Sequence, residues 1–118
     1  MKENVLKDKS YQFALSIISF YKYMIESKKE YILSKQILRS GTSIGAMVEE
    51  ANQAESKSDF IHKLSVANKE ANETNYWLRL LHNSDLVTNE HLPLQKDCQE
   101  IIRLLTSIIK SAKLNMKK

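Results

Sequence analysis

The segment RSGTSIGAMVEEA, residues 39–51, contains both glycines of this 118-residue chain. A glycine inside a helix costs about 1 kcal/mol relative to alanine, yet the residues on either side follow a helical pattern. Gly41 and Gly45 fall on or beside the apolar stripe of that pattern. A missing side chain on such a stripe allows another backbone to approach closely. The segment therefore predicts a tightly packed helix, either inside one bundle or against another subunit.

The neighbours of the glycine pair exclude two other interpretations. Glycines four residues apart also occur where membrane helices dimerise, but that motif requires an apolar segment of about 20 residues. Arg39, Glu49 and Glu50 interrupt any such segment here. A phosphate-binding loop requires a preceding strand and a Gly-Lys-Ser/Thr sequence, and the segment has neither. Close packing is thus the role that we assign to the two glycines.

On both sides of this segment, apolar residues at spacings of three and four predict further helices. We expect four helices, at about 4–27, 31–54, 59–83 and 90–114. The core stripes that we predict are Phe13, Ala14, Ile17, Ile18, Tyr21, Met24 and Ile25 in the first helix, Leu33, Ile37, Gly41, Ile44, Val48 and Ala51 in the second, Phe60, Leu64, Ala67, Ala71, Thr74, Leu78 and Leu81 in the third, and Leu94, Cys98, Ile101, Leu105, Ile108 and Ala112 in the fourth.

The similar lengths of these helices predict how they are arranged. Each is about 37 Å long at 1.5 Å per residue, and short polar turns such as ESKKE, residues 26–30, connect them. Two glycines and one proline are few helix breakers for 118 residues. We therefore predict an all-α, antiparallel up-down-up-down four-helix bundle that forms one domain over residues 1–118.

Composition limits the compartment and the partners. Hydrophobic residues make up 42% and charged residues 27% of the chain, and the net charge is +4, which permits an acidic partner such as RNA without requiring one. A single cysteine excludes an internal disulfide and favours a reducing cytoplasm. The N-terminus lacks the apolar run of a secretion signal, and no segment reaches the ~20 apolar residues of a membrane span. We expect a cytoplasmic protein without membrane contact.

No residue pattern predicts catalysis. Asp59 and His62 have the carboxylate-x-x-His spacing of di-metal bundles, but that pattern requires a second copy on another helix. The serines and histidines lack the local setting of a catalytic triad. Cys98 lies on an apolar stripe, as a small core residue does. We therefore predict no enzyme, no catalytic residue, no metal, no cofactor and no small-molecule substrate.

The clearest charge pattern lies in the fourth helix. Five basic residues and no acidic residue follow Glu100. Four of them span about 80° of the helix, opposite the apolar stripe. This face is either a solvated surface that also complements the helix dipole, or a phosphate-binding stripe without aromatic residues for base stacking. The candidate nucleic-acid-binding residues are Arg103, Lys110, Lys113 and Lys117.

The third helix carries aromatic residues beside its apolar stripe. Trp77 precedes the core position Leu78, and Tyr76 precedes Trp77. A large aromatic residue at such a flank either seals the edge of the bundle or contacts a partner. Tyr76 and Trp77 are therefore candidate interface residues, together with Gly41 and Gly45. We also expect Arg39 to pair with a glutamate close to these stripes.

The segment LSKQILRSGTSIGAMVEEANQAESKSDFIHKLSVANKEANETNYWLRLL, residues 33–81, resembles a bacterial protein family. It is similar to the four-helix-bundle proteins encoded in intervening sequences of 23S rRNA genes, which are often labelled ribosomal-protein-like. The specific pieces are RS (39–40), SIGA (43–46), DFIHKLS (59–65) and KEANETNYWLRLL (69–81). The chain departs from the family pattern at Met47, where asparagine is common, and at Glu49, where alanine is common.

The resemblance implies an up-down bundle that commonly assembles as a ring-like homopentamer, with no assigned catalytic residues. The family is also similar to the accessory bundle protein of diversity-generating retroelements, which is implicated in binding nucleic acid and reverse transcriptase. We therefore predict a non-enzymatic homo-oligomer that associates with RNA or the ribosome through its basic helix face. The alternative is a protein-binding adaptor with no direct RNA contact.

Overall fold

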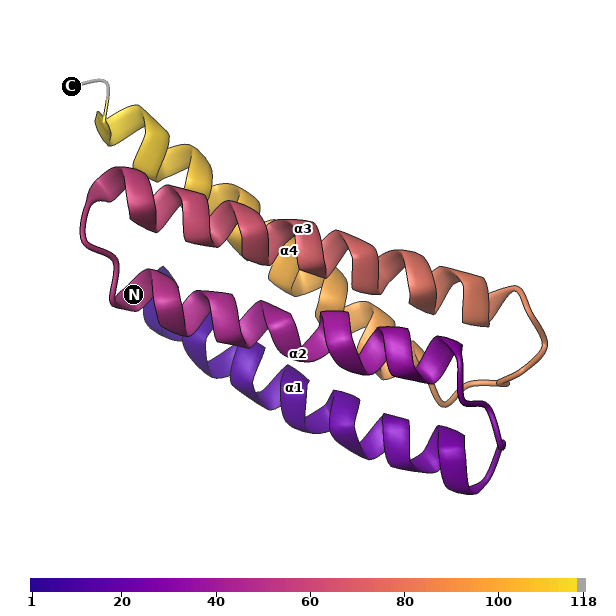
Figure 1. Cartoon of the computed structure of the whole chain (residues 1–118). Helices are drawn as coiled ribbons and strands as arrows, with labels where there is room; N and C mark the ends of the chain where they lie inside the picture. The colour runs from indigo at the N-terminus through magenta and orange to yellow at the C-terminus, as the bar shows by residue number, and fades with distance from the viewer. Residues whose placement is uncertain (117–118) are drawn as a thin grey trace.

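Four long helices joined by short turns make up the computed structural model, which describes residues 1–116 (Figure 1). The helices are α1 (Lys2–Glu26), α2 (Leu33–Asn52), α3 (Lys57–His82) and α4 (Leu92–Met116). Each runs antiparallel to the next, and α1 and α3 each pack against both α2 and α4. The bundle measures 51 × 22 × 21 Å. The predicted all-α up-down-up-down bundle is confirmed, and each helix bound lies within two residues of its predicted position.

The start of α2 depends on a cap that the sequence pattern did not reveal. Lys29 turns the chain with a φ of 56°. The carboxylate of Glu30 then accepts hydrogen bonds from the backbone N–H groups of Ile32, Leu33 and Ser34, at 3.1, 2.9 and 2.8 Å. Partial burial raises the pKa of this carboxyl, but these hydrogen bonds outweigh burial and lower the pKa below its usual range. Glu30 therefore acts as the N-terminal cap of α2.

Replacing Glu30 with alanine is expected to lower the free energy of unfolding by about 1–2 kcal/mol, because it removes the acceptor for these N–H groups. Glu30→Gln should lose less, since an amide oxygen still accepts hydrogen bonds. Urea unfolding of both variants measures the effect, with Glu55→Ala in an exposed turn as the control. If Glu30→Ala and Glu55→Ala are equally stable, Glu30 is not a cap.

The core confirms the predicted stripes of three helices almost residue by residue. All six predicted positions of α4 are buried, from Leu94 to Ala112. In α2 and α3 the first positions differ, because Ser34 and Ile61 are buried where Leu33 and Phe60 were predicted, and α2 also buries Ser40, which was not predicted. Leu33 and Phe60 are half-buried and pack against the edge of the core.

The predicted stripe of α1 is partly wrong. The buried residues are Leu6, Ser10, Phe13, Ile17, Phe20 and Met24, whereas Ile18 is 43% exposed. Apolar residues cover a wider arc of α1 than one stripe, and packing against both α2 and α4 selects the side that contains Leu6 and Phe20. A second apolar strip is left outside the bundle. We call it the outer α1 face and define it by Tyr11, Leu15 and Ile18, which are 58%, 45% and 43% exposed.

The two glycines lie where α2 approaches α1. A Cβ atom on Gly41 would lie 2.8 Å from Cγ1 of Ile17, which is closer than carbon atoms can approach. A Cβ atom on Gly45 would lie 3.3 Å from the backbone oxygen of Ser10. Gly41 is buried beneath Ile17, and Gly45 is half-buried at the outer edge of the contact. Of the two, Gly45 is therefore the residue that a second molecule could touch.

Candidate interaction surfaces

The predicted basic residues of α4 lie on its outer face. Arg103, Lys110 and Lys113 are exposed, and Ile101, Leu105 and Ile108 on the opposite side of the helix are buried. Within residues 1–116, none of the three cations has an ion-pair or hydrogen-bond partner. The fourth predicted residue, Lys117, lies outside the described residues. The three described cations are therefore available to an acidic partner.

Acidic side chains of α4 face another direction. Glu100 turns toward α1, where its carboxylate accepts a hydrogen bond of 3.2 Å from Nζ of Lys9. That hydrogen bond and the charge of Lys9, with smaller effects of Lys96 and Arg103, lower the pKa of Glu100. Glu100 thus forms an ion pair with α1, while it also lies near Lys96 and Arg103 of its own helix. A phosphate could approach α4 at Arg103, Lys110 and Lys113, which are exposed.

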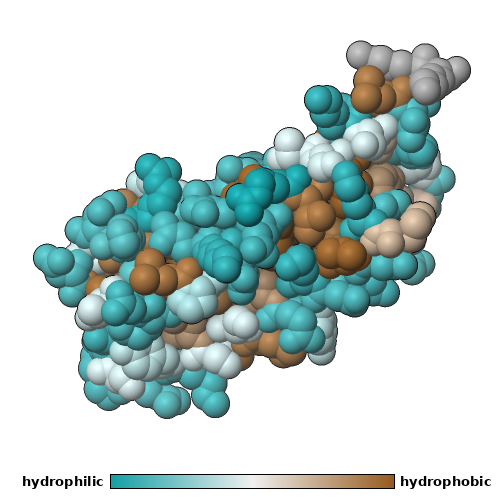
Figure 2. All heavy atoms as spheres, turned by 180° about the vertical axis from the view of Figure 1, so that it is seen from behind, coloured by the Kyte–Doolittle hydropathy of each residue, from teal (hydrophilic) through white to brown (hydrophobic). Residues whose placement is uncertain are grey.

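The rear of the molecule is mainly hydrophilic, but hydrophobic side chains gather toward the end at which α4 projects from the bundle (Figure 2). Leu114 and Met116 in this projecting part are 54% and 51% exposed. The side chains of Lys110 and Lys113 lie beside them and line a shallow hollow of about 360 Å³ with Leu114. The basic face of α4 therefore ends in a mixed basic and apolar tip.

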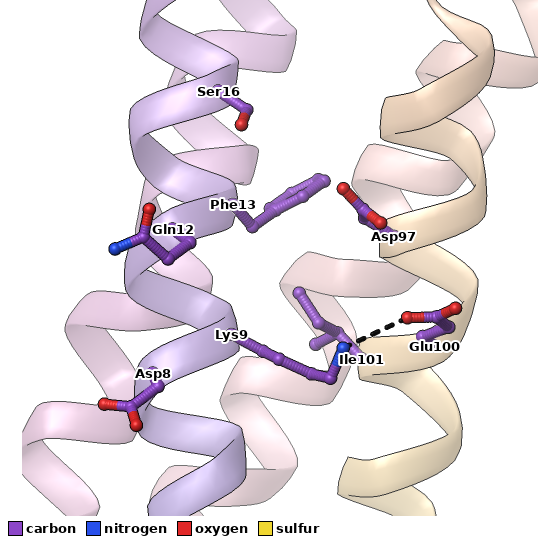
Figure 3. A pocket seen from close by; sticks show the side chains of 8 residues that line it. All are labelled: Asp8, Lys9, Gln12, Phe13, Ser16, Asp97, Glu100 and Ile101. Atoms are coloured by element: carbon purple, nitrogen blue, oxygen red, sulfur yellow. Dashed lines mark hydrogen bonds and ion pairs between the residues drawn. The ribbon is translucent and has the colours of Figure 1, made fainter.

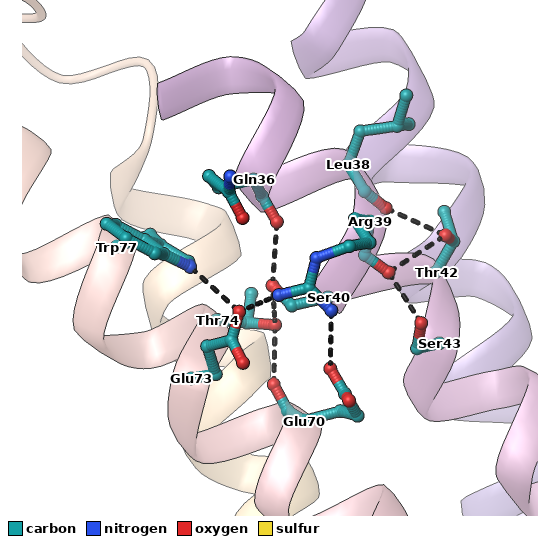
Figure 4. A network of polar contacts seen from close by, with 10 residues as sticks. All are labelled: Gln36, Leu38, Arg39, Ser40, Thr42, Ser43, Glu70, Glu73, Thr74 and Trp77. Carbon is teal, nitrogen blue, oxygen red and sulfur yellow. Dashed lines mark hydrogen bonds and ion pairs between the residues drawn. The ribbon is translucent and has the colours of Figure 1, made fainter. Parts of the chain in front are cut away.

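Trp77 belongs to a polar network that closes the edge between α2 and α3 (Figure 4). Its indole Nε1–H donates to Glu73 at 3.2 Å. Arg39 of α2 reaches across to α3, where it pairs with Glu73 and, at 3.3 Å, with Glu70. Trp77 is half-buried, while Tyr76 packs edge-on against it at 5.2 Å and is 49% exposed. Within the chain Trp77 therefore seals the bundle edge, and Tyr76 is the more accessible of the pair.

A second surface follows the contact between α1 and α2. Gly45, Ala46 and Thr42 of α2 and Tyr11 and Ala14 of α1 line a hollow of about 180 Å³. Three of the four α2 residues that line it are small, and the fourth is Glu49, whose carboxylate lies 3.9 Å from Nζ of Lys7. The outer α1 face borders this hollow through Tyr11. Together they form an apolar, notched surface that the described residues leave uncovered.

A histidine pair joins α3 to the start of α4. Nδ1 of His82 lies 2.9 Å from Nε2 of His91. His91 is fully buried, and its Nδ1 has no hydrogen-bond partner within residues 1–116. Burial, with the neighbouring His82, lowers the pKa of His91 below its ordinary 6.5, although the charge of Glu90 acts in the opposite direction. The folded chain therefore disfavours the charged form of His91.

This pair predicts a loss of stability in mild acid. Unfolded His91 takes up a proton at a higher pH than folded His91, so the free energy of unfolding falls as the pH drops below 6.5. Urea unfolding at about pH 7.5 and about pH 5.5 measures the fall. His91→Phe should reduce it, and His62→Gln on the exposed side of α3 should not. An identical fall in the His91→Phe variant would show that another group carries the pH dependence.

The residues considered from the sequence for metal binding or catalysis form no metal site in the described part of the chain. Asp59 accepts the backbone N–H of Glu55 at 3.3 Å, at the start of α3, and His62 is exposed. Within residues 1–116 no three His, Cys, Asp or Glu side chains are placed to hold a metal ion. Burial, together with the charge of Asp97, raises the pKa of the Cys98 thiol to about 12, so it is an unreactive core residue.

Four antiparallel helices around a filled core define a small all-α helical-bundle protein. No helix in the described part of the chain is long and apolar enough to span a bilayer. The chain belongs to the 23S rRNA-intervening sequence protein family, whose model matches residues 2–107. The family predicted from the sequence is thus confirmed.

A solved structure supports this membership. The chain is similar to a protein of unknown function from the S23 ribosomal protein family of Bacteroides thetaiotaomicron VPI-5482, with 55% sequence identity and a TM-score of 0.90. The match covers 93% of this chain and 99% of that one. Among curated proteins none matches the sequence. Neither the family description nor that of the similar structure names an enzymatic activity.

Proposed function

We propose that this chain is a non-enzymatic, self-associating bundle protein that binds RNA through the outer face of α4. The observation that carries the proposal is the set of exposed cations Arg103, Lys110 and Lys113 on one side of one helix, which have no ion-pair partner among residues 1–116. Phosphate groups bind such cations and release their own counterions. The ribosomal label of the family agrees with RNA as the acidic partner.

The arrangement of the cations predicts the kind of RNA binding. Along the helix axis, Arg103 and Lys110 are separated by about 10.5 Å, and Lys110 and Lys113 by about 4.5 Å, so the three cations extend over about 15 Å of one helix. The exposed aromatic residues Tyr11, Tyr31 and Tyr76 belong to α1, the α1–α2 turn and α3. No base-stacking platform accompanies the cations, so binding should depend on salt and little on base sequence.

Fluorescence anisotropy of a labelled RNA, recorded from about 0.05 to about 0.3 M salt, tests this function. Each phosphate contact should contribute about −0.7 to −0.9 to the slope of log K against log salt. Two RNAs of equal length and different sequence should give similar affinities. Affinity that does not change with salt, or binding to only one of the two RNAs, would contradict a contact through backbone phosphates.

For self-association we assign the uncovered surface between α1 and α2. The outer α1 face supplies large apolar side chains, and the hollow beside Gly45 can accept a side chain from a second copy. A closed ring of more than two copies requires two different faces on each subunit. Tyr76 with Trp77, on the other side of α2, is our candidate for the second face. A homopentamer is the assembly that the family resemblance implies.

Placing charge on the outer α1 face is expected to separate the subunits. Leu15→Glu with Ile18→Glu would bury two carboxylates in the proposed interface, which is strongly unfavourable. Light scattering coupled to gel filtration measures the mass, which should fall to that of a monomer. Leu86→Glu with Leu92→Glu is the matched control, because these leucines are 42% and 40% exposed near the α3–α4 turn. A monomeric wild-type chain would rule out the assembly altogether.

A protein-binding adaptor without RNA contact is the second candidate, and the exposed ring of Tyr76 packed on Trp77 favours it. Aromatic side chains in such positions commonly anchor protein interfaces. Isolation of the tagged chain with its partners, before and after nuclease treatment, separates the two functions. Partners that survive the nuclease and are lost in Tyr76→Ser favour the adaptor.

A further inference from the structure

A continuous groove follows the contact between α1 and α4. It consists of two hollows, of about 300 and about 420 Å³, which share Ser16 and Asp97. Its floor is apolar, because Phe13, Phe20, Leu94 and Ile101 line it. Phe13 and Phe20 are only 2% and 6% exposed, so they form the base of the groove and not its rim. In Figure 3 the ring of Phe13 extends from α1 toward α4, where Asp97 points back at it.

One side of the groove is a regular polar wall. The α1 residues that line it recur at intervals of three or four, so they occupy one side of the helix over successive turns. They are Asp8, Gln12, Ser16, Ser19 and Tyr23. From Asp8 to Tyr23 this wall is about 22 Å long at 1.5 Å per residue. The groove is therefore long and narrow rather than round.

The rim of the groove is negative in a chain whose net charge is +4. Glu100 pairs with Lys9, which is the only basic residue among the lining side chains. Glu90 accepts a hydrogen bond of 2.9 Å from the hydroxyl of Tyr23 and lies 3.7 Å from Lys28. The side chains of Asp8 and Asp97 form no ion pair within residues 1–116. Two carboxylates thus border an aromatic floor without a cation to balance them.

We propose that this groove binds a basic, extended peptide segment of a partner protein. Apolar side chains of the segment would pack on the apolar floor of the groove, and its lysines or arginines would pair with Asp8 and Asp97. At ~3.3 Å per residue, an extended segment of about seven residues spans the groove. Phosphates are repelled by the same carboxylates, so RNA is not the occupant. The proposal does not depend on the proposed RNA binding, because that function is assigned to other residues, Arg103, Lys110 and Lys113.

A labelled peptide tests the groove directly. The probe is a fluorescein-labelled octapeptide of alternating lysine and leucine, titrated with the full chain and followed by anisotropy. Asp97→Lys should weaken binding about tenfold or more, because it places a cation at the rim. Glu55→Lys changes the net charge equally in the distant α2–α3 turn and should leave binding within about twofold. Ser16→Trp, which fills the middle of the groove without changing charge, should also weaken binding.

Each remaining outcome overturns the proposal. Equal weakening by Asp97→Lys and Glu55→Lys would show that only the net charge matters. Displacement of the peptide by an equal concentration of spermine would identify a small amine as the ligand. Loss of self-association in Asp97→Lys would identify a second copy as the occupant. Circular dichroism verifies that the variants fold, and Asp97→Asn, a milder change, should give an intermediate loss of affinity.

Discussion

Replacing Gly41 with leucine is expected to lower the free energy of unfolding by about 3 kcal/mol. Even the first added atom, Cβ, would lie 2.8 Å from Cγ1 and 2.9 Å from Cδ1 of Ile17. Ile17 is itself fully buried, so its side chain has no free space to enter. The variant must therefore push α1 away from α2. For a domain of this size such a loss is a large part of its stability.

Alanine substitutions at both glycines separate packing from helix propensity. Each gains about 1 kcal/mol of helix propensity. Gly41→Ala should still be destabilising because of Ile17, whereas Gly45→Ala meets only the backbone oxygen of Ser10 at 3.3 Å and should stay within about 1 kcal/mol of the wild type. Combining Gly41→Ala with Ile17→Val should restore part of the loss, since it removes one methyl group at the contact.

Chemical unfolding of these variants measures the free energies directly. A Gly41→Leu variant as stable as the wild type would mean that α1 and α2 are not in close contact at this position. The same result would remove the physical reason for both glycines. Equal effects of Gly41→Ala and Gly45→Ala would show that helix propensity, and not the Ile17 contact, decides the outcome.

Reversing the charge of Arg103, Lys110 and Lys113 to glutamate is expected to weaken RNA binding about 100-fold or more at about 0.1 M salt. Three phosphate contacts would be lost, so the slope of log K against log salt should also become smaller by about 2 to 3. All three side chains are exposed and have no partner in the described chain, so the bundle should keep its fold. Circular dichroism and thermal unfolding verify that point.

A matched variant distinguishes a localised RNA contact on α4 from a general effect of net charge on affinity. Lys35, Lys57 and Lys69 are also exposed, and they lie on α2 and α3. Their replacement by glutamate changes the net charge equally and should leave the slope nearly unchanged, apart from a modest general weakening. If both triple variants lose RNA equally, the contact is not localised on α4, and the face is a solvated surface.

The fourth helix shows how much a clear amphipathic pattern predicts. Its apolar stripe, the burial of Cys98 and the outward position of Arg103, Lys110 and Lys113 all followed from one periodicity. The reason is that the apolar arc of α4 is narrow, so only one rotation of the helix buries it. Lys117, on the same predicted face, lies outside the described residues.

The first helix shows where such a pattern fails. Its apolar residues fill a wide arc, and several rotations bury a similar area. The choice depends on the two helices that pack against it. That choice placed Ile18 outside the bundle and Phe20 inside it. The outer α1 face and the α1–α4 groove both result from this rotation, so neither could be predicted from periodicity alone.

The amino-acid sequence by itself determined the helices and their antiparallel order, because these depend on local periodicity and on turn residues. It also determined the family, because the family's motifs are short, contiguous segments of the chain. Tertiary structure decided the rotation of α1, the cap of α2 by Glu30, the His82–His91 contact and the ion pair between Lys9 of α1 and Glu100 of α4. Each of these joins residues whose relative positions are set only when the helices pack, and packing depends on the shapes of all the neighbouring side chains at once.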